Sequence, residues 1–264
     1  MRWKGSGSRA DDPAGRSPIR ILILSDLHAN WEATRAALAA ARDLGFDRAA
    51  VLGDLVGYGG SPEEVVREVR ELAPEVVIRG NHDRVVSGIE DGEDFNFLAI
   101  QAALMNRRLL SEDSLRYLAD LPSGPLPLLE GCIVVHGSPR DEDEYVVDVP
   151  EAAEIFQQTD FNLCLFGHTH IPCVFRRSAS GTSRVFPAAD GTRVALRPGE
   201  RLLLNPGSVG QPRDEDPRAS FLLLDDERRE AVFHRVVYPI QQAQLRILEA
   251  GIPPLLAQRL ERGV

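Results

Sequence analysis

The chain has 264 residues, 43% of them hydrophobic, which is enough for one globular domain with a core of several layers. Its net charge of −10 is spread along the sequence, and a body this acidic disfavours binding to a nucleic-acid polymer. No apolar stretch approaches the roughly 20 residues of a membrane span, so we expect no membrane association.

The N-terminal segment is polar and rich in Gly, Ser and Arg, without the apolar region of a secretory signal. We therefore expect residues 1–17 to be a disordered leader and residues 18–264 to form the folded domain. Three cysteines, Cys132, Cys164 and Cys173, cannot all pair with one another. Buried free thiols are the simpler interpretation, and they favour a reducing, cytoplasmic location.

The first half of the domain alternates strands with helices. Short apolar runs rich in β-branched residues predict strands at 19–24, 49–54 and 75–81. Helical periodicity between these runs predicts two helices, at 30–45 and 61–74. This order implies a parallel sheet whose strands are joined by right-handed crossovers.

Both helices carry signals at their ends. Asn30 is expected to act as the N-cap of the first helix, and Gly45 to end it. In the second helix, Ser61 and Glu64 are expected to form a capping box, with Pro62 at the first helical position. These signals support the helical assignment of both segments.

Residues 88–122 change character, because they show two helical patterns, split near Ser111, and no strand pattern. We expect a helical excursion beside the sheet. A strand at 131–137, a helix at 150–158 and a strand at 162–170 then resume the alternation.

The last third of the chain favours antiparallel strands. Asp190-Gly191, placed between apolar segments, predicts a hairpin turn. Three more strands are expected to follow, at 201–207, 220–226 and 231–239. Two terminal helices, at 239–250 and 253–262, are expected to end the chain. The whole pattern predicts a layered α/β architecture with helices on both flanks.

Polar residues gather at the ends of the predicted strands. Asp26 and His28 follow the first strand, and if its extended geometry continues they point to the same side. Later strands are followed by Asp54, Asn81, His82, His136, His168 and His170. Because ligands bind beyond the carboxyl ends of strands in open α/β sheets, we predict that these side chains form one cluster.

Such a cluster offers more ligands than one tetrahedral zinc ion needs. Seven candidate ligands suit two divalent ions about 3.5–4 Å apart that share a carboxylate. The two ions would carry about two more positive charges than Asp26 and Asp54 offset, which would attract a phosphate, and a hydroxide held between them would be the nucleophile. We expect Mn first, with Fe, Zn, Co and Ni as alternatives, since all accept mixed His and carboxylate sites.

Five sequence blocks occur in order between residues 25 and 170: SDLHAN, GDLVGYG, RGNHD, VVHGSP and FGHTH. Together they resemble the signature blocks of the calcineurin-like metallophosphoesterases. The segment NPGSVGQPRDEDPRAS, at 205–220, further resembles the bacterial and archaeal small phosphodiesterase branch. The resemblance implies a four-layer α/β fold, in which a double β-sandwich is flanked by helices.

The same resemblance implies roles for individual residues. One ion would be held by Asp26, His28, Asp54 and His170. The other would be held by Asp54, Asn81, His136 and His168, with Asp54 as the bridge. His82 matches the residue proposed to protonate the leaving oxygen or stabilise the transition state, and Asp83 would orient it.

One departure from the family concerns the grip on phosphate. Gly57-Tyr58 replaces the Asp-Arg pair of the protein Ser/Thr phosphatases, although Arg79 keeps its place. We therefore expect a small phosphodiester or nucleotide-like substrate, bound by Asn30, Arg79, Arg213 and Arg218. The alternative for Arg213 and Arg218 is pairing with neighbouring acidic residues, which would brace the 205–220 loop.

Other functions stay open at this point. They are a protein Ser/Thr phosphatase, a dinucleoside polyphosphate hydrolase, a nuclease and a non-catalytic scaffold such as the retromer subunit of this fold. Retention of His82 with all the ligands favours catalysis over a scaffold. The acidic composition and the absence of a basic region argue against a nuclease.

Overall fold

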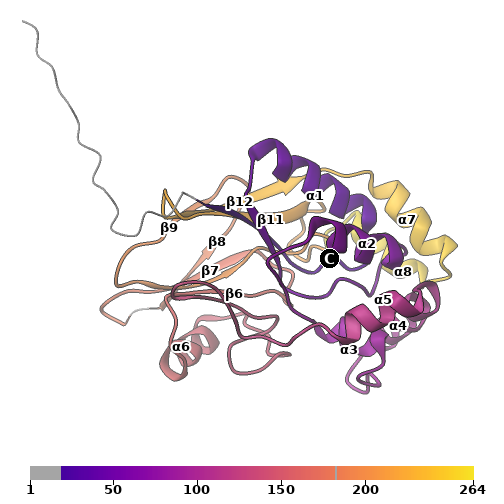
Figure 1. The fold of residues 1–264 in the computed structure, drawn as a ribbon, viewed down its shortest axis with the longest axis horizontal. Coiled ribbons are helices and arrows are strands. Elements are labelled where there is room, and N and C mark those ends of the chain that lie inside the picture. Colours follow the sequence, from indigo (N-terminus) through magenta and orange to yellow (C-terminus); the bar gives the residue numbers. More distant parts are fainter. Residues whose placement is uncertain (1–18, 182) are drawn as a thin grey trace, which may run out of the picture.

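The computed structural model describes residues 19–181 and 183–264, so the expected leader at 1–17 lies outside the described residues. Two six-stranded sheets pack face to face, with helices on their outer faces (Figure 1). This arrangement is the flanked double β-sandwich that the motifs imply. Among the described residues, no helix is both long and apolar enough to cross a lipid bilayer.

The first sheet joins a parallel half to an antiparallel half. Its strands, in spatial order, are β3 (Val76–Val77), β2 (Arg48–Val51), β1 (Arg20–Leu24), β11 (Ala219–Asp225), β12 (Glu230–Val236) and β9 (Arg193–Ala195). β1, β2 and β3 pair in parallel, as their alternation with helices predicted. β11 then pairs antiparallel with β1. Strands from the last third of the chain therefore complete the sheet that the N-terminal strands begin.

The second sheet has the same mixed character. Its strands, in spatial order, are β4 (Leu126–Leu129), β5 (Cys132–Val134), β6 (Leu163–Leu165), β10 (Arg201–Asn205), β7 (Cys173–Arg177) and β8 (Ser183–Pro187). The three central strands β5, β6 and β10 are parallel. Their carboxyl ends therefore lie at one edge of the sheet.

Helices form the two outer layers. α1 (Trp31–Leu44), α2 (Pro62–Leu72), α7 (Ile240–Glu249) and α8 (Pro254–Leu260) pack on the first sheet. α4 (Phe97–Leu109) and α5 (Glu112–Ala119) form the excursion predicted at 88–122, and with α3 (Asn81–Ser87) they gather at one end of the molecule (Figure 1). α6 (Val149–Gln158) packs on the second sheet, on the side opposite α1 and α7 (Figure 1).

β1 shows why its sequence is continuously apolar. Ile21 and Ile23 face the second sheet, whereas Leu22 and Leu24 face the helices, because successive side chains of a strand point to opposite faces. Both faces are buried, so the strand has no polar side. The three cysteines are likewise buried free thiols, as expected.

Both predicted N-cap residues stand at the start of their helices, but the capping box predicted for Ser61 and Glu64 does not form. The Asn30 side chain accepts a hydrogen bond from the Ala33 N–H at 3.1 Å, so it caps α1. Ser61 forms no side-chain cap bond in α2. Glu64 contacts Arg246 instead, at 3.5 Å, because α7 brings a cation to the start of α2.

The hairpin predicted at Asp190-Gly191 is also wrong. β8 pairs with β7 and β9 pairs with β12, so the turn joins the two sheets instead of two paired strands. The Gly191 N–H donates to the Phe233 carbonyl at 2.9 Å, which fixes the turn against β12. The residues Asp190-Gly191 predict a turn, but they do not determine which strands pair. β8 pairs with the edge of β7 in one sheet, and β9 pairs with the edge of β12 in the other.

Candidate metal centre

The residues at the centre lie in loops that turn sharply after strands. Five of them have a left-handed backbone, with φ between 47° and 65°: Asp26, His28, Asp54, His168 and His170. Non-glycine residues adopt this conformation uncommonly, at a cost of about 1–3 kcal/mol each, and such strain persists where a site requires it. The expectation that Asp26 and His28 continue an extended strand is therefore wrong, and the turns bring the side chains together.

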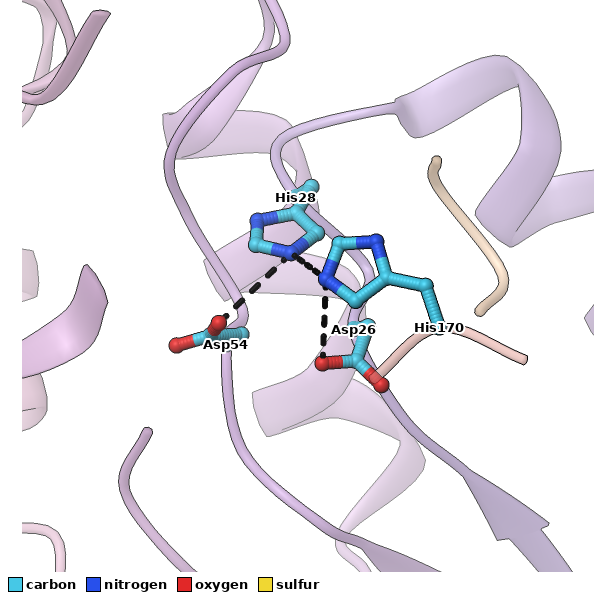
Figure 2. Close-up of side chains that lie close together, drawn as sticks. All are labelled: Asp26, His28, Asp54 and His170. Atoms are coloured by element: carbon cyan, nitrogen blue, oxygen red, sulfur yellow. Dashed lines mark hydrogen bonds and ion pairs between the residues drawn. The ribbon is translucent and has the colours of Figure 1, made fainter. Parts of the chain in front are cut away.

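The first ligand group consists of Asp26, His28, Asp54 and His170, whose candidate ligand atoms lie within 4.8 Å of one another. The His28 Nε2 lies 2.9 Å from the His170 Nε2 and 3.5 Å from an Asp54 carboxylate oxygen. The His170 Nε2 lies 3.6 Å from an Asp26 oxygen. Figure 2 shows the two rings pointing toward one another, with both carboxylates beside their facing nitrogens.

The second ligand group consists of Asp54, His136 and His168, whose candidate ligand atoms also lie within 4.8 Å of one another. The His136 Nε2 lies 3.4 Å from an Asp54 oxygen, so Asp54 belongs to both groups. Asn81 lines the cavity above Asp54 and His168, and its buried Oδ1 has no hydrogen-bond partner in the described structure. The structure thus brings all seven predicted ligands to one place.

The hydrogen bonds of the imidazoles fit metal binding. The Nδ1 atoms of His28, His136 and His170 face backbone carbonyls at 3.0, 2.7 and 2.7 Å. A carbonyl only accepts, so each Nδ1 carries a proton, and in the neutral ring that binds a metal each Nε2 presents a lone pair to the centre. Two facing lone pairs at 2.9 Å are favourable only beside a cation. Imidazole and carboxylate donors of this kind suit divalent transition metals.

Burial disfavours charge on most groups of the centre, and the exception is a cation that faces the Asp54 carboxylate. Burial raises the pKa of Asp26 to about 7 and lowers that of His168 to about 3. Burial disfavours protonated His136 as well, but the Asp54 carboxylate outweighs it and raises the His136 pKa to about 10. Asp54 therefore stabilises a neighbouring cation strongly enough to overcome desolvation.

The NPGSVGQ half of the 205–220 segment frames these loops. The Asn205 Nδ2 donates to the Gly167 carbonyl at 2.7 Å, beside His168. The Ser208 hydroxyl donates to the Asp26 carbonyl at 2.8 Å. This half of the segment thus holds ligand loops in place.

His82 lies at the start of α3, in the wall of the same cavity. Only 3% of its surface is exposed, and burial lowers its pKa to about 4, so the ring is neutral at pH 7. Its ring centroid lies 4.4 Å from that of Tyr58 and 4.5 Å from that of Phe95. Its Nδ1 has no hydrogen-bond partner among the described residues, so aromatic packing holds the ring.

Asp83 does not take the orienting role expected of it. Its carboxylate accepts hydrogen bonds from the N–H groups of Leu55, Val56 and Gly80 at 2.9, 3.3 and 2.9 Å, and none from His82. These bonds tie the loop after β2 to the start of α3. Asp83 is therefore a structural brace between two ligand loops.

We expect Asp83→Ala to lower the free energy of unfolding by about 2–5 kcal/mol, because it leaves three buried N–H groups without an acceptor. Urea unfolding of the purified variant measures this loss. Asp83→Asn keeps one acceptor oxygen and should lose less. Equal stability of Asp83→Ala and the natural protein would contradict the bracing role.

A cavity of about 500 Å³ lies over the ligand groups. Its floor contains Asp54, His168 and His170. Its walls are made by aromatic and charged side chains from several loops, namely Tyr58, Phe95, Tyr145, Arg84, Asp143 and Arg213, and by residues 90–94. The excursion therefore walls the site.

Of the four predicted substrate-binding residues, Arg213 is the one that lines this cavity. Its guanidinium carbon lies 5.6 Å from the centroid of the Tyr58 ring. One Nη donates to the Gln211 side chain at 3.1 Å, and its buried Nε has no hydrogen-bond partner in the described structure. Arg213 thus has donor capacity left for a ligand.

The other three candidates are engaged elsewhere. Arg79 forms two hydrogen bonds with Glu142, at 3.1 and 3.0 Å. Arg218 pairs with Asp216 at 2.6 Å and Asp190 at 3.4 Å, which is the bracing alternative. The Asn30 side chain caps α1 and donates to the Gly210 carbonyl at 2.8 Å. The side chains of Arg79, Arg218 and Asn30 are thus bonded to other parts of the protein, and none of them lines the cavity.

Sequence reasoning missed two aromatic residues of the cavity. The Tyr145 ring lies 4.0 Å from that of His168, and the Phe95 ring lies beside His82. Neither residue belongs to a signature block. The one available signal was that each ends an acidic run, in EDGEDF and DEDEY.

Comparisons with known proteins agree with this geometry. The family model described as calcineurin-like phosphoesterase superfamily domain matches residues 19–229. An uncharacterized protein of Methanocaldococcus jannaschii is 32% identical over 246 residues, which cover 92% of this chain and 98% of that protein.

Two solved structures are similar over nearly the whole chain. The crystal structure of a metallophosphoesterase from Sphaerobacter thermophilus has 39% identity and a TM-score of 0.83, covering 94% of this chain and 100% of that one. A hypothetical protein from Pyrococcus horikoshii OT3 shares the fold, with 20% identity, a TM-score of 0.75 and coverage of 93% and 98%. Together with the buried Asp and His groups, these matches show that the chain belongs to the calcineurin-like phosphoesterase superfamily.

Proposed function

We propose that the protein hydrolyses a small phosphodiester or nucleotide-like substrate with the help of two divalent metal ions. Mn is the first candidate for these ions, and Fe, Zn, Co and Ni are the alternatives. The observation that carries the proposal is that one buried carboxylate, Asp54, is shared by two ligand groups on the floor of a cavity. When bound there, such ions polarise phosphoryl oxygens and lower the pKa of water toward about 7.

Two residues of the chain would act directly on the substrate. His82, neutral at pH 7, can donate one ring N–H to the leaving oxygen or to a non-bridging oxygen. Arg213, on the cavity wall, can bind the phosphate with a charge-assisted hydrogen bond. Both side chains contact Tyr58, which places them on the same part of the wall.

The cavity supports a small substrate over a polymer. Its volume of about 500 Å³ falls within the 300–1,000 Å³ typical of small-molecule sites. The exposed carboxylates of Asp91, Glu93 and Asp94 line it and form no ion pair among the described residues. Their negative charge would repel a nucleic-acid backbone and a multiply phosphorylated protein surface.

A cytoplasmic location is part of the same proposal. All three cysteines are buried free thiols in the described structure, which suits a reducing compartment. The metals proposed here do not depend on them, since none of the three lies in either ligand group.

The proposal is tested with a substrate panel. Phosphomonoesters, phosphodiesters, dinucleoside polyphosphates and a phosphoprotein are assayed with protein loaded in turn with each candidate metal. We expect the highest kcat/KM on a small phosphodiester or nucleotide. A phosphoprotein as the best substrate, or no hydrolysis by protein carrying a full metal load, would show that the proposed function is wrong.

We expect Arg213→Ala to raise KM with little change in kcat, because an arginine that binds phosphate equally in the ground and transition states contributes only to binding. Arg218→Ala is the matched control from the same loop. Its ion pairs with Asp216 and Asp190 predict a lower Tm and an unchanged KM. Steady-state kinetics and thermal unfolding of both variants separate the two roles, and the reverse pattern would assign the phosphate contact to Arg218.

A further inference from the structure

The helical excursion reaches the metal centre through a buried asparagine. Asn106 of α4 has an exposed fraction of 0%. Its Oδ1 accepts a hydrogen bond from the Gly57 N–H, and its Nδ2 donates to the Gly59 carbonyl, both at 2.8 Å. One side chain therefore satisfies the backbone on both sides of Tyr58.

The turn at residues 57–59, to which Asn106 is hydrogen-bonded, has an unfavourable backbone conformation that needs stabilising contacts. Gly57 has a φ of 93° and Tyr58 has a φ of 56°, both in the left-handed region. A bulky residue such as Tyr is rarely found there, and such a conformation persists only when its surroundings determine it. The paired hydrogen bonds of Asn106 provide that support from outside the signature blocks.

Tyr58 in turn contacts both residues proposed to act on the substrate. Its ring packs against His82 and lies under the guanidinium of Arg213. A Cβ added at Gly57 would lie 2.2 Å from the His82 Nδ1, so only glycine leaves room for that ring. Because Asp83 forms no hydrogen bond with His82, the orientation of the His82 ring depends on its neighbours in the packing.

We propose that Asn106 and Tyr58 are positioning residues of this centre. Asn106 fixes the turn at 57–59, and the Tyr58 ring then holds His82 and Arg213 in the cavity wall. The inference rests on the proposed function and adds to it a role for the excursion in the chemical step. Such positioning matters because a misplacement of about 1 Å can lower the rate about 10²-fold.

The test compares four variants of the full chain: Tyr58→Ala, Tyr58→Phe, Asn106→Leu and Leu118→Ala. Tyr58→Ala should lower kcat about 10- to 100-fold and raise KM, because both His82 and Arg213 lose their support. Tyr58→Phe keeps the ring and should restore values close to the natural protein. Asn106→Leu should lower kcat about 10-fold, with metal content unchanged by elemental analysis.

Leu118→Ala controls for destabilisation of the excursion. It removes a fully buried side chain of α5 and none of the hydrogen bonds to the turn, so it should lower Tm without lowering kcat. If Asn106→Leu loses no more kcat than Leu118→Ala, the role of Asn106 is wrong. If Tyr58→Phe is as impaired as Tyr58→Ala, the hydroxyl acts and the ring does not.

A binding measurement separates this inference from the proposed function. Titration calorimetry of the manganese-loaded protein with inorganic phosphate should show weaker binding for Tyr58→Ala and unchanged binding for Tyr58→Phe. Hydrolysis of no panel substrate by the natural protein would overturn the proposed function alone. Equal phosphate affinity in Tyr58→Ala and the natural protein would overturn the support of Arg213 by Tyr58.

Discussion

Asp54→Asn is expected to reduce the metal content at both ligand groups and to abolish hydrolysis. One Asp54 oxygen lies 3.5 Å from the His28 Nε2 and 3.4 Å from the His136 Nε2, so a single carboxylate serves both groups. The amide removes its negative charge but keeps an oxygen for the hydrogen bond from the His82 N–H. We therefore expect the folded variant to lose metal, and elemental analysis measures the loss.

Asp26→Asn is the matched control for this experiment. Asp26 belongs to the first ligand group and is absent from the second, so its substitution should reduce metal content by about half of an expected two ions. Circular dichroism and Tm check that both variants are folded. A load of about two ions per chain in Asp54→Asn would contradict the bridging role.

His82→Ala is expected to keep its metal ions and to lose about 10²- to 10⁴-fold in kcat, the usual range for a side chain that donates a proton or a hydrogen bond to the charge developing in the reaction. The reason is geometric, because the His82 ring lines the cavity while its side chain belongs to neither ligand group. Its backbone N–H donates to Asp54 at 2.9 Å, and this bond survives the substitution. Steady-state kinetics and elemental analysis of one preparation measure both quantities.

The choice of substrate sharpens the test of His82. A poor leaving group needs help with its developing charge more than nitrophenolate does, so the loss should be larger on a substrate with an alcohol leaving group. His234→Ala supplies a histidine control outside the cavity, since that ring stacks on Phe221 at 5.2 Å. Unchanged turnover of the poor substrate by metal-loaded His82→Ala would exclude the role.

The sequence alone predicted the layered fold and the cluster of candidate ligands. Both predictions depend on local patterns, because apolar runs and helical periodicity can be read within a window of a few residues. Asp26, Asp54 and His168 each follow such a run, and the carboxyl ends of parallel strands meet at one edge of a sheet. Their convergence follows once the strands are known.

The contacts of each side chain were decided by the tertiary structure. Arg213 and Arg218 each follow a proline in one segment, yet Arg213 faces the cavity and Arg218 pairs with Asp190, 28 residues away. A turn forms at Asp190-Gly191, but not the predicted hairpin, because β8 and β9 join different sheets. The type of side chain determines which partners a residue can bind, and the tertiary structure determines which of those partners lie close enough to bind.

Asn106 shows the same limit at the centre itself. Its place in a helix follows from the predicted excursion, but its partners, Gly57 and Gly59, lie 49 and 47 residues away. Asp83 likewise stands beside His82 in the chain and bonds to the loop after β2 instead. Sequence determined which residues carry the chemistry, and tertiary packing decided which of them hold the others in place, because buried polar groups bind whichever partners the fold brings within hydrogen-bond distance.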